Sequence, residues 1–209
     1  MKSCVNNLPT WEKQVPEFTF DEASHTYRLD GKAIGSVTEI IKEAGFNPNT
    51  AHYSKRSAHK GQMIHLVTEM YDRDELDESS IDDETTPFLD AYKLFVSETE
   101  FIPFKIEHRG YCPVNRFGYT LDRTGICNRE TRPILLDIKS GVAEPWHRIQ
   151  TAAYDSVQAV PHVRYALYLQ GNGKYKFIKH DKRVDFERWK AALTMFCFKL
   201  ETGQYKLKG

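Results

Sequence analysis

The segment Pro-Ile-Leu-Leu-Asp-Ile-Lys-Ser-Gly, which begins at residue 133, constrains the fold of this chain more than any other. Successive side chains of a β-strand point to opposite faces, so Ile134, Leu136 and Ile138 would share one face. Asp137 and Lys139 would then share the other face. The segment therefore predicts a sheet that is buried on one side and presents an aspartate and a lysine together on the other.

Local signals at the start of the chain predict a hairpin followed by a helix. Two short strands are expected within residues 17–34, around Asp30-Gly31, a dipeptide that favours a type I′ turn. Ser36 and Glu39 have the spacing of a capping box, and Gly45 suits the position after a helix end. A helix is therefore expected over residues 37–44.

Hydrophobic periodicity predicts the remaining elements. Helices are expected over residues 57–71, 87–97, 145–160 and 184–200, and strands over residues 105–111, 117–126, 133–140, 163–169 and 175–179. The first three of these strands are expected to be consecutive and antiparallel. Residues 72–84 are polar and acidic, so an exposed loop is expected there.

The predicted fold class is α/β, with a central mixed sheet flanked by helices. A chain of 209 residues with 40% hydrophobic content can bury one core and does not demand two. We expect residues 1–209 to form a single domain, in which the N-terminal hairpin and helix elaborate the core.

Several classes of protein are disfavoured by the sequence. It lacks an apolar run of membrane-spanning length and a signal-peptide pattern, so a soluble cytoplasmic protein without a membrane partner is expected. Its four cysteines are scattered, which disfavours a disulfide framework and a thiolate metal site. The formal net charge is zero, but residues 72–107 are acid-rich and residues 170–209 are base-rich. A local basic face therefore remains open, as does the alternative of two solvated helix faces.

Two aspartates point to metal chemistry. Asp122 lies inside a predicted strand, and a symmetric hairpin would place it opposite Asp137. Neighbouring carboxylates repel each other unless a cation lies between them. Mg²⁺ or Mn²⁺ could bind Asp122, Asp137 and the carbonyl of Ile138, with Lys139 beside the attacking water. The alternative is a surface ion pair between Asp137 and Lys139, with Asp122 separately solvated.

Motifs in a fixed order carry a family resemblance. They are Gly35-Ser36-Val37-Thr38 before a helix, Lys60-Gly61 and His65 on a helix, Gly118 to Asp122 on a strand, Asp137-Ile138-Lys139 on the next strand, and Gln150 with Tyr154 on the following helix. Together they resemble the PD-(D/E)XK nuclease superfamily, in its RecB-type branch of phage exonucleases and the mitochondrial genome maintenance exonuclease. The resemblance covers residues 36–154 and implies a restriction-endonuclease-like core.

The resemblance also implies roles for individual residues. It implies metal binding by His65, Asp122 and Asp137, catalytic assistance by Lys139, and positions beside the site and the DNA backbone for Gln150 and Tyr154.

Two further assignments have ordinary structural alternatives. Ser36 and Thr38 open a helix and are expected to bind a DNA phosphate, the alternative being a helix cap without a ligand. Glu69 lies one turn after His65, and it is either an outer partner of the metal site or an exposed helix residue.

The function that these expectations favour is a DNA exonuclease that requires Mg²⁺ or Mn²⁺ and digests DNA from its ends. The resemblance suggests a role in phage or mobile-element recombination, in the host cytoplasm, with a single-strand annealing protein as a candidate partner. A structure-specific or sequence-specific endonuclease is one alternative, because the same metal core serves both reactions. A catalytically inactive DNA-binding module is another, although the intact set of Asp122, Asp137 and Lys139 argues against it.

Overall fold

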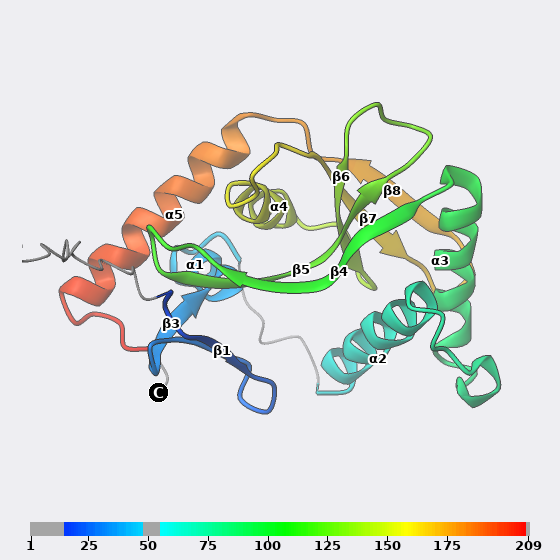
Figure 1. The fold of residues 1–209 in the computed structure, drawn as a ribbon, viewed down its shortest axis with the longest axis horizontal. Coiled ribbons are helices and arrows are strands. Elements are labelled where there is room, and N and C mark those ends of the chain that lie inside the picture. The colour runs from blue at the N-terminus through cyan, green and yellow to red at the C-terminus, as the bar shows by residue number, and fades with distance from the viewer. Residues whose placement is uncertain (1–14, 48–54, 208–209) are drawn as a thin grey trace, which may run out of the picture.

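The computed structural model describes residues 15–47 and 55–207, which form one mixed β-sheet with helices against both faces (Figure 1). The strands are β1 (Phe18–Asp21), β2 (Thr26–Leu29), β3 (Lys32–Ser36), β4 (Ile102–Tyr111), β5 (Phe117–Ile126), β6 (Ile134–Lys139), β7 (Val163–Leu169) and β8 (Tyr175–Lys179). They run in the order β1-β2-β3-β5-β6-β7-β8, and β4 pairs with β5 outside this path. β3 with β5 and β6 with β7 are parallel, whereas the other pairs are antiparallel. The predicted α/β class with a central mixed sheet is confirmed.

Helices cover the sheet in two layers. They are α1 (Val37–Glu43), α2 (Lys55–Asp72), α3 (Thr86–Thr99), α4 (His147–Asp155) and α5 (Val184–Glu201), with a short 3₁₀ helix at Glu78–Ser80. Residues of α1, α4 and α5 pack in one core with Leu121 and Leu135 of the sheet. Residues of α2 and α3 pack in a second core with Leu136 and Ile138. Because β6 contributes to both cores, it is buried on both faces.

The fork at β5 shapes the centre of the molecule. β4 pairs along β5 from Gly118 to Ile126, so β3 and β6 must share the other edge of β5. β3 meets β5 at Phe117 and Gly118, whereas β6 meets it at residues 123–125. Between these two ladders, residues 119–122 of β5 pair with neither β3 nor β6. Asp122 lies in this interval, next to the end of the β6 ladder.

The N-terminal hairpin differs from the prediction by one additional strand. Asp30 and Gly31 have φ values of 52° and 74°, as a type I′ turn requires, and this turn joins β2 to β3. β1 precedes this pair and joins it through a further turn. The predicted capping box at Ser36 is present, and α1 ends shortly before Gly45, whose φ is 78°.

The predicted loop over residues 72–84 was wrong at its start. Asp72 is the last residue of α2, and its side chain is only 3% exposed because it pairs with Arg123. The predicted helix over residues 145–160 is also shorter, since α4 spans His147–Asp155. No helix within residues 15–47 and 55–207 combines the length and the hydropathy that crossing a membrane requires.

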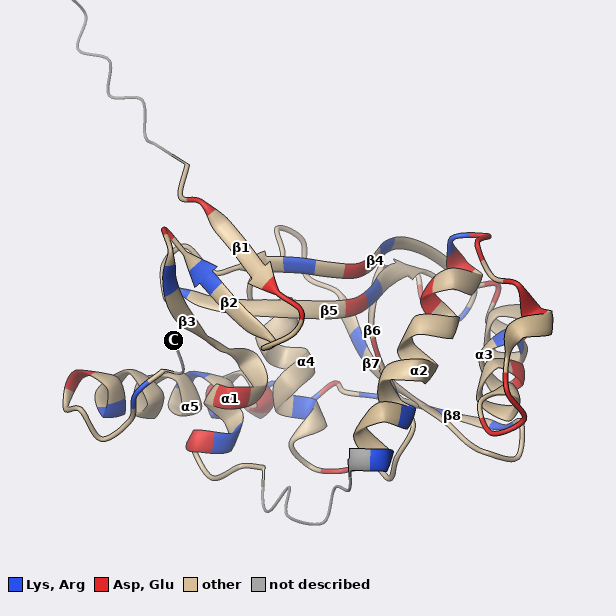
Figure 2. Cartoon of the chain, turned by 90° about the horizontal axis from the view of Figure 1, so that it is seen from below, with Lys and Arg blue, Asp and Glu red and all other residues tan. Residues whose placement is uncertain are grey.

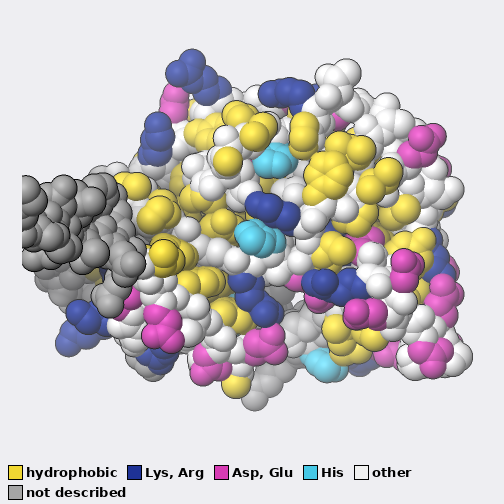
Figure 3. Space-filling view, viewed as in Figure 1, with side chains coloured by type: hydrophobic (Ala, Val, Ile, Leu, Met, Phe, Trp, Pro, Cys, Tyr) yellow, Lys and Arg dark blue, Asp and Glu magenta, His cyan; other side chains and the backbone are white. Residues whose placement is uncertain are grey.

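β4 is a partly apolar edge strand. Ile102 and Phe104 are 56% and 60% exposed, and Ile126 beside them on β5 is 40% exposed. Figure 3 shows hydrophobic side chains gathered over the end of β4 near α3. Pro103 lacks a backbone N–H, and the ladder with β5 shifts between Pro103 and Lys105. Both features limit the pairing of this edge with another strand.

Candidate metal and catalytic site

The end of the β5–β6 ladder brings the two predicted aspartates together. Arg123 pairs with Leu136, and the next step of the same register places Asp122 opposite Asp137. The Asp122 carboxylate then accepts a hydrogen bond of 2.6 Å from the backbone N–H of Ile138. A side chain thus takes the place of a ladder carbonyl where the strands part. The Ile138 side chain is fully buried in the second core, on the side of α2 and α3.

Lys139 and Asp137 form a buried ion pair. The Lys139 Nζ atom lies 2.9 Å from Oδ1 of Asp137 and 2.8 Å from Oδ2, and Asp137 is 1% exposed. Burial raises the pKa of Asp137 to about 6, although Lys139 acts in the opposite direction. Both carboxylate oxygens of Asp137 are therefore paired with the Lys139 ammonium.

His65 of α2 joins Asp122 and a residue that the sequence analysis missed, Glu107 of β4. The Nδ1 atom of His65 lies 3.4 Å from Oε1 of Glu107 and 3.8 Å from Oδ1 of Asp122. One potential ligand atom from each of these residues lies within 4.8 Å of the other two. Figure 2 shows the corresponding charged stretches of β4 and β5 side by side near α2.

The pKa shifts of these groups follow from their contacts. Burial opposes the charged form of His65, but the nearby Asp122 and Glu107 raise its pKa overall. Burial raises the pKa of Asp122. For Glu107 burial is opposed by His65 and Arg123, and the net effect is a lowered pKa. The three groups therefore form one electrostatic unit.

The observed register of the β4–β5 hairpin explains why Glu107 lies beside Asp122. Ile106 pairs with Arg123 and His108 pairs with Leu121, so Glu107 lies opposite Asp122. A symmetric hairpin between the predicted strands at residues 105–111 and 117–126 would instead place Glu107 opposite Leu121, because the observed ladder pairs Tyr111 with Gly118 and not with Phe117. The backbone of Glu107 has a φ of 45°, in the left-handed region that non-glycine residues rarely adopt, and no sequence pattern indicated it.

The buried Arg123 side chain connects residues of the site through hydrogen bonds. Its side chain is 0% exposed, and it donates hydrogen bonds of 2.5 Å to Asp72, 2.9 Å to Glu107 and 2.7 Å to the carbonyl of Asp122. Asp72 also accepts a hydrogen bond of 2.7 Å from Tyr92. This network holds β4, which carries Glu107, and β5, which carries Asp122, in place against α2, which carries His65.

The charges around the site do not balance. Four carboxylates face two side chains with permanent positive charge, namely Asp72, Glu107, Asp122 and Asp137 against Arg123 and Lys139. Two negative charges are left over when His65 is neutral. A divalent cation would cancel this excess, and carboxylate and imidazole donors are suitable ligands for Mg²⁺ or Mn²⁺. The donor set of His65, Glu107 and Asp122 and the charge excess therefore both fit a bound divalent ion, and the predicted ligand Asp137 lies outside this group of three.

A cleft of about 580 Å³ opens over this group. Its lining includes eight of the predicted site residues: Ser36, Thr38, His65, Glu69, Asp122, Lys139, Gln150 and Tyr154. The predicted site residues Asp137 and Ile138 do not line it, and Asp137 contacts the lining through its ion pair with Lys139. Glu69 pairs with Arg73 at 3.0 Å, and this contact supports its reading as a helix residue. Its role as an outer partner of the metal site stays a prediction.

Gln150 and Tyr154 contribute from α4. The amide nitrogen of Gln150 donates a hydrogen bond of 2.7 Å to the Tyr154 hydroxyl, whose own proton is thereby free for another acceptor. Within the described part of the chain, Oε1 of Gln150 has no hydrogen-bond partner, and Gln150 is 6% exposed. Burial, with Asp137 and Asp122 nearby, raises the pKa of Tyr154 well above its ordinary value. Tyr154 is therefore a neutral hydrogen-bond donor at the cleft.

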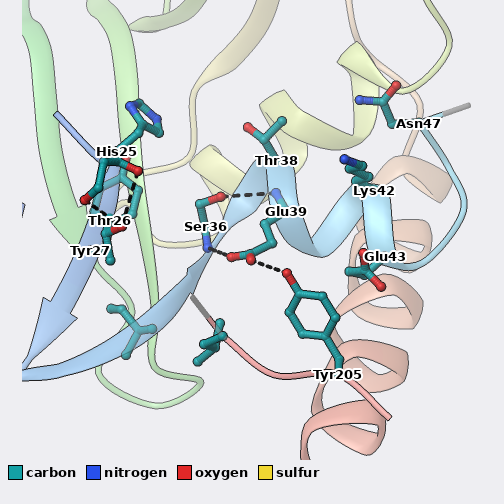
Figure 4. Close-up of a pocket in the computed structure, with 13 residues that line it drawn as sticks. His25, Thr26, Tyr27, Ser36, Thr38, Glu39, Lys42, Glu43, Asn47 and Tyr205 are labelled. Atoms are coloured by element: carbon teal, nitrogen blue, oxygen red, sulfur yellow. Dashed lines mark hydrogen bonds between the residues drawn. The ribbon is translucent and has the colours of Figure 1, made fainter. Parts of the chain in front are cut away.

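A second pocket of about 450 Å³ adjoins the cleft and shares Ser36 and Thr38 with it (Figure 4). The Ser36 hydroxyl accepts a hydrogen bond of 3.1 Å from the N–H of Glu39, and the Glu39 carboxylate accepts one of 3.3 Å from the N–H of Ser36. The hydroxyl of Tyr205 also donates to Glu39. A carboxylate therefore already lies at the positive end of α1. A DNA phosphate at Ser36 and Thr38 stays a prediction.

Comparison with protein-family models gives no match to this chain, and comparison with curated protein sequences also gives none. The PD-(D/E)XK resemblance thus rests on the order of the motifs in the sequence itself.

Proposed function

We propose that this protein is a divalent-metal-dependent deoxyribonuclease with a restriction-endonuclease-like core, which hydrolyses phosphodiester bonds from DNA ends. The observation that carries the proposal is the Asp137–Lys139 pair beside Asp122, since Asp122 and Lys139 both line the cleft. The motif order supports DNA as the substrate. The excess of buried carboxylates supports the requirement for a metal.

Asp122, Asp137 and His65 would hold the ion, together with the predicted carbonyl of Ile138. A bound divalent ion supplies a water of lowered pKa and stabilises negative charge on the phosphate. The Asp122 carboxylate is kept in place by the N–H of Ile138, and Asp137 by Lys139. These contacts hold the ligand atoms in position before substrate arrives, which reduces the reorganisation needed during the reaction.

Lys139 and the α4 residues act on the substrate in this proposal. A lysine keeps its charge at neutral pH, so Lys139 stabilises the charge that develops on the phosphate and orients the attacking water. The Tyr154 hydroxyl donates a hydrogen bond to a phosphate oxygen, and Gln150 positions this hydroxyl. Each of these residues lines the same cleft.

The test is digestion of end-labelled linear single-stranded and double-stranded DNA and of a closed circle, each with Mg²⁺, Mn²⁺ or EDTA. We expect metal-dependent loss of the linear DNA and an intact circle. Cutting of the circle would instead indicate an endonuclease, and no cutting of any substrate would indicate a DNA-binding module.

Lys139→Ala should abolish cleavage and leave DNA binding largely intact, as measured by fluorescence anisotropy with Ca²⁺ in place of the active metal. Lys93→Ala is a matched control, because Lys93 pairs with Glu78 and is absent from the residues that line the cleft. Cleavage by Lys139→Ala at the wild-type rate would refute the assignment of this site.

A further inference from the structure

Glu107 lies close enough to His65 and Asp122 to bind the same metal ion. Its Oε1 atom is 3.4 Å from Nδ1 of His65, and that nitrogen is 3.8 Å from Oδ1 of Asp122. In an octahedral site with bonds of about 2.1 Å, neighbouring ligand atoms are about 3.0 Å apart and opposite ones about 4.2 Å apart. Both measured separations fall between these values, so the three side chains need little movement to enclose one ion.

The ion pairs within the protein leave negative charge at the site uncompensated, which favours the binding of a metal ion. Arg123 is shared between Asp72 and Glu107, and Lys139 pairs with Asp137. Asp122 thus has no permanent cation within ion-pair distance in the described part of the chain, and its contact there is His65. A protonated His65 would add one positive charge, which leaves the excess of two carboxylates only half compensated.

Independent support comes from an unpartnered acceptor at the same cleft. Oε1 of Gln150 is buried, and it has no hydrogen-bond partner within residues 15–47 and 55–207. Buried acceptors normally have partners. Waters bound to an ion at this site would supply a donor, because Gln150 lines the cleft with His65, Glu107 and Asp122.

We infer that Glu107 is a further protein ligand of the ion that His65 and Asp122 hold in the proposed function, and that this site binds Mn²⁺ in preference to Mg²⁺. The inference rests on the proposed metal-dependent function and deepens it. Mg²⁺ favours oxygen ligands and retains its waters, whereas an imidazole suits first-row transition metals. A site with one imidazole and at least two carboxylates therefore replaces more of the hydration shell than Mg²⁺ readily gives up.

The experiment measures metal binding without DNA. Mn²⁺ and Mg²⁺ are titrated into the wild type, Glu107→Gln and Glu22→Gln, and binding is followed by calorimetry. Glu22 is the matched control, because it lines the same cleft but pairs with Arg109. We expect Mn²⁺ to bind the wild type roughly tenfold or more tightly than Mg²⁺, and Glu107→Gln to weaken Mn²⁺ binding by a similar factor. Glu22→Gln should change it less than about twofold.

Two further measurements keep the test decisive. Pulsed electron paramagnetic resonance of bound Mn²⁺ should show coupling to an imidazole nitrogen, and His65→Asn should remove it. Glu107→Asp retains the negative charge beside Arg123, so it replaces Glu107→Gln if that variant fails to fold. Mn²⁺ affinity that is unchanged in these Glu107 variants, or Mg²⁺ bound as tightly as Mn²⁺, would overturn the inference.

DNA cleavage separates this inference from the proposed function. If the wild type cuts DNA while the Glu107 variants bind Mn²⁺ normally, the inference fails and the nuclease proposal stands. If Glu107 proves to bind Mn²⁺ but the wild type cuts no DNA, the metal site stands and the nuclease proposal fails.

Discussion

Replacement of Arg123 by methionine tests whether the buried network behind the site holds the fold together. Methionine roughly keeps the volume of the side chain but removes every hydrogen bond that the guanidinium donates. Asp72 and Glu107 would lose their shared cation, and the carbonyl of Asp122 would lose a donor. Arg123 and Asp72 are 0% and 3% exposed, so water cannot replace the lost partner without local opening.

The magnitude follows from the burial of the pair. Removal of one partner of a buried ion pair costs about 3–5 kcal/mol, because the remaining charge is left uncompensated. A domain of this size loses roughly 2–4 °C in Tm for each kcal/mol, so Arg123→Met should lower the Tm by roughly 6–20 °C. Arg123→Met combined with Asp72→Leu should be less destabilised than the sum of the two single variants.

Urea denaturation and thermal melts of the four proteins in this double-mutant cycle measure the effect. Arg73→Met is the control, because Arg73 is 40% exposed and its pair with Glu69 should contribute less than about 1 kcal/mol. Equal losses of stability in Arg123→Met and Arg73→Met would show that the burial argument is wrong.

Two further predictions concern stability. A Cβ at Gly118 would lie 2.2 Å from Cγ of Tyr27, so Gly118→Ala should displace the N-terminal hairpin and lower the urea midpoint, whereas Gly141→Ala, which meets no atom within 4 Å, should leave it nearly unchanged. Burial, with Arg148 and Arg164 nearby, lowers the pKa of His180 to about 4, so below the unfolded value of about 6.5 the unfolded state takes up a proton that the folded state does not. Stability from this residue is therefore present at neutral pH and is lost as the pH falls from 6.5 towards 4. Wild type should lose about 2 kcal/mol more than His180→Asn between pH 7 and pH 5 in urea denaturation, and parallel losses in the two proteins would contradict the assignment.

Local sequence patterns predicted most of the sheet. Strands β5, β7 and β8 have the predicted bounds, because apolar and β-branched runs are delimited there by turn residues. The opposition of Asp122 and Asp137 also followed from a local quantity, the register of a hairpin. These features depend on residues that are close in the sequence.

The parts that were missed depend on distant contacts. Asp72 looked like the start of an acidic loop, and its burial results from Arg123, 51 residues further along the chain. Glu107 was within a predicted strand, but its role requires His65 from α2 and a left-handed backbone conformation. Neither the pairing of a helix end with a strand nor a positive φ at glutamate has a local signature in the sequence.

The fork at β5 has a consequence for motion. β3 is joined to β5 through two residue pairs, at Gly35 and Ser36, whereas β6 pairs with β7 along its whole length. The wall of the cleft formed by β2 and β3 can therefore separate at a lower free energy than the central strands, while Asp122 and Asp137 stay in register. In amide hydrogen exchange, β2 and β3 should form one cooperative unit and β6 and β7 a slower one. Opening of the first unit would then widen the cleft without separating the two aspartates.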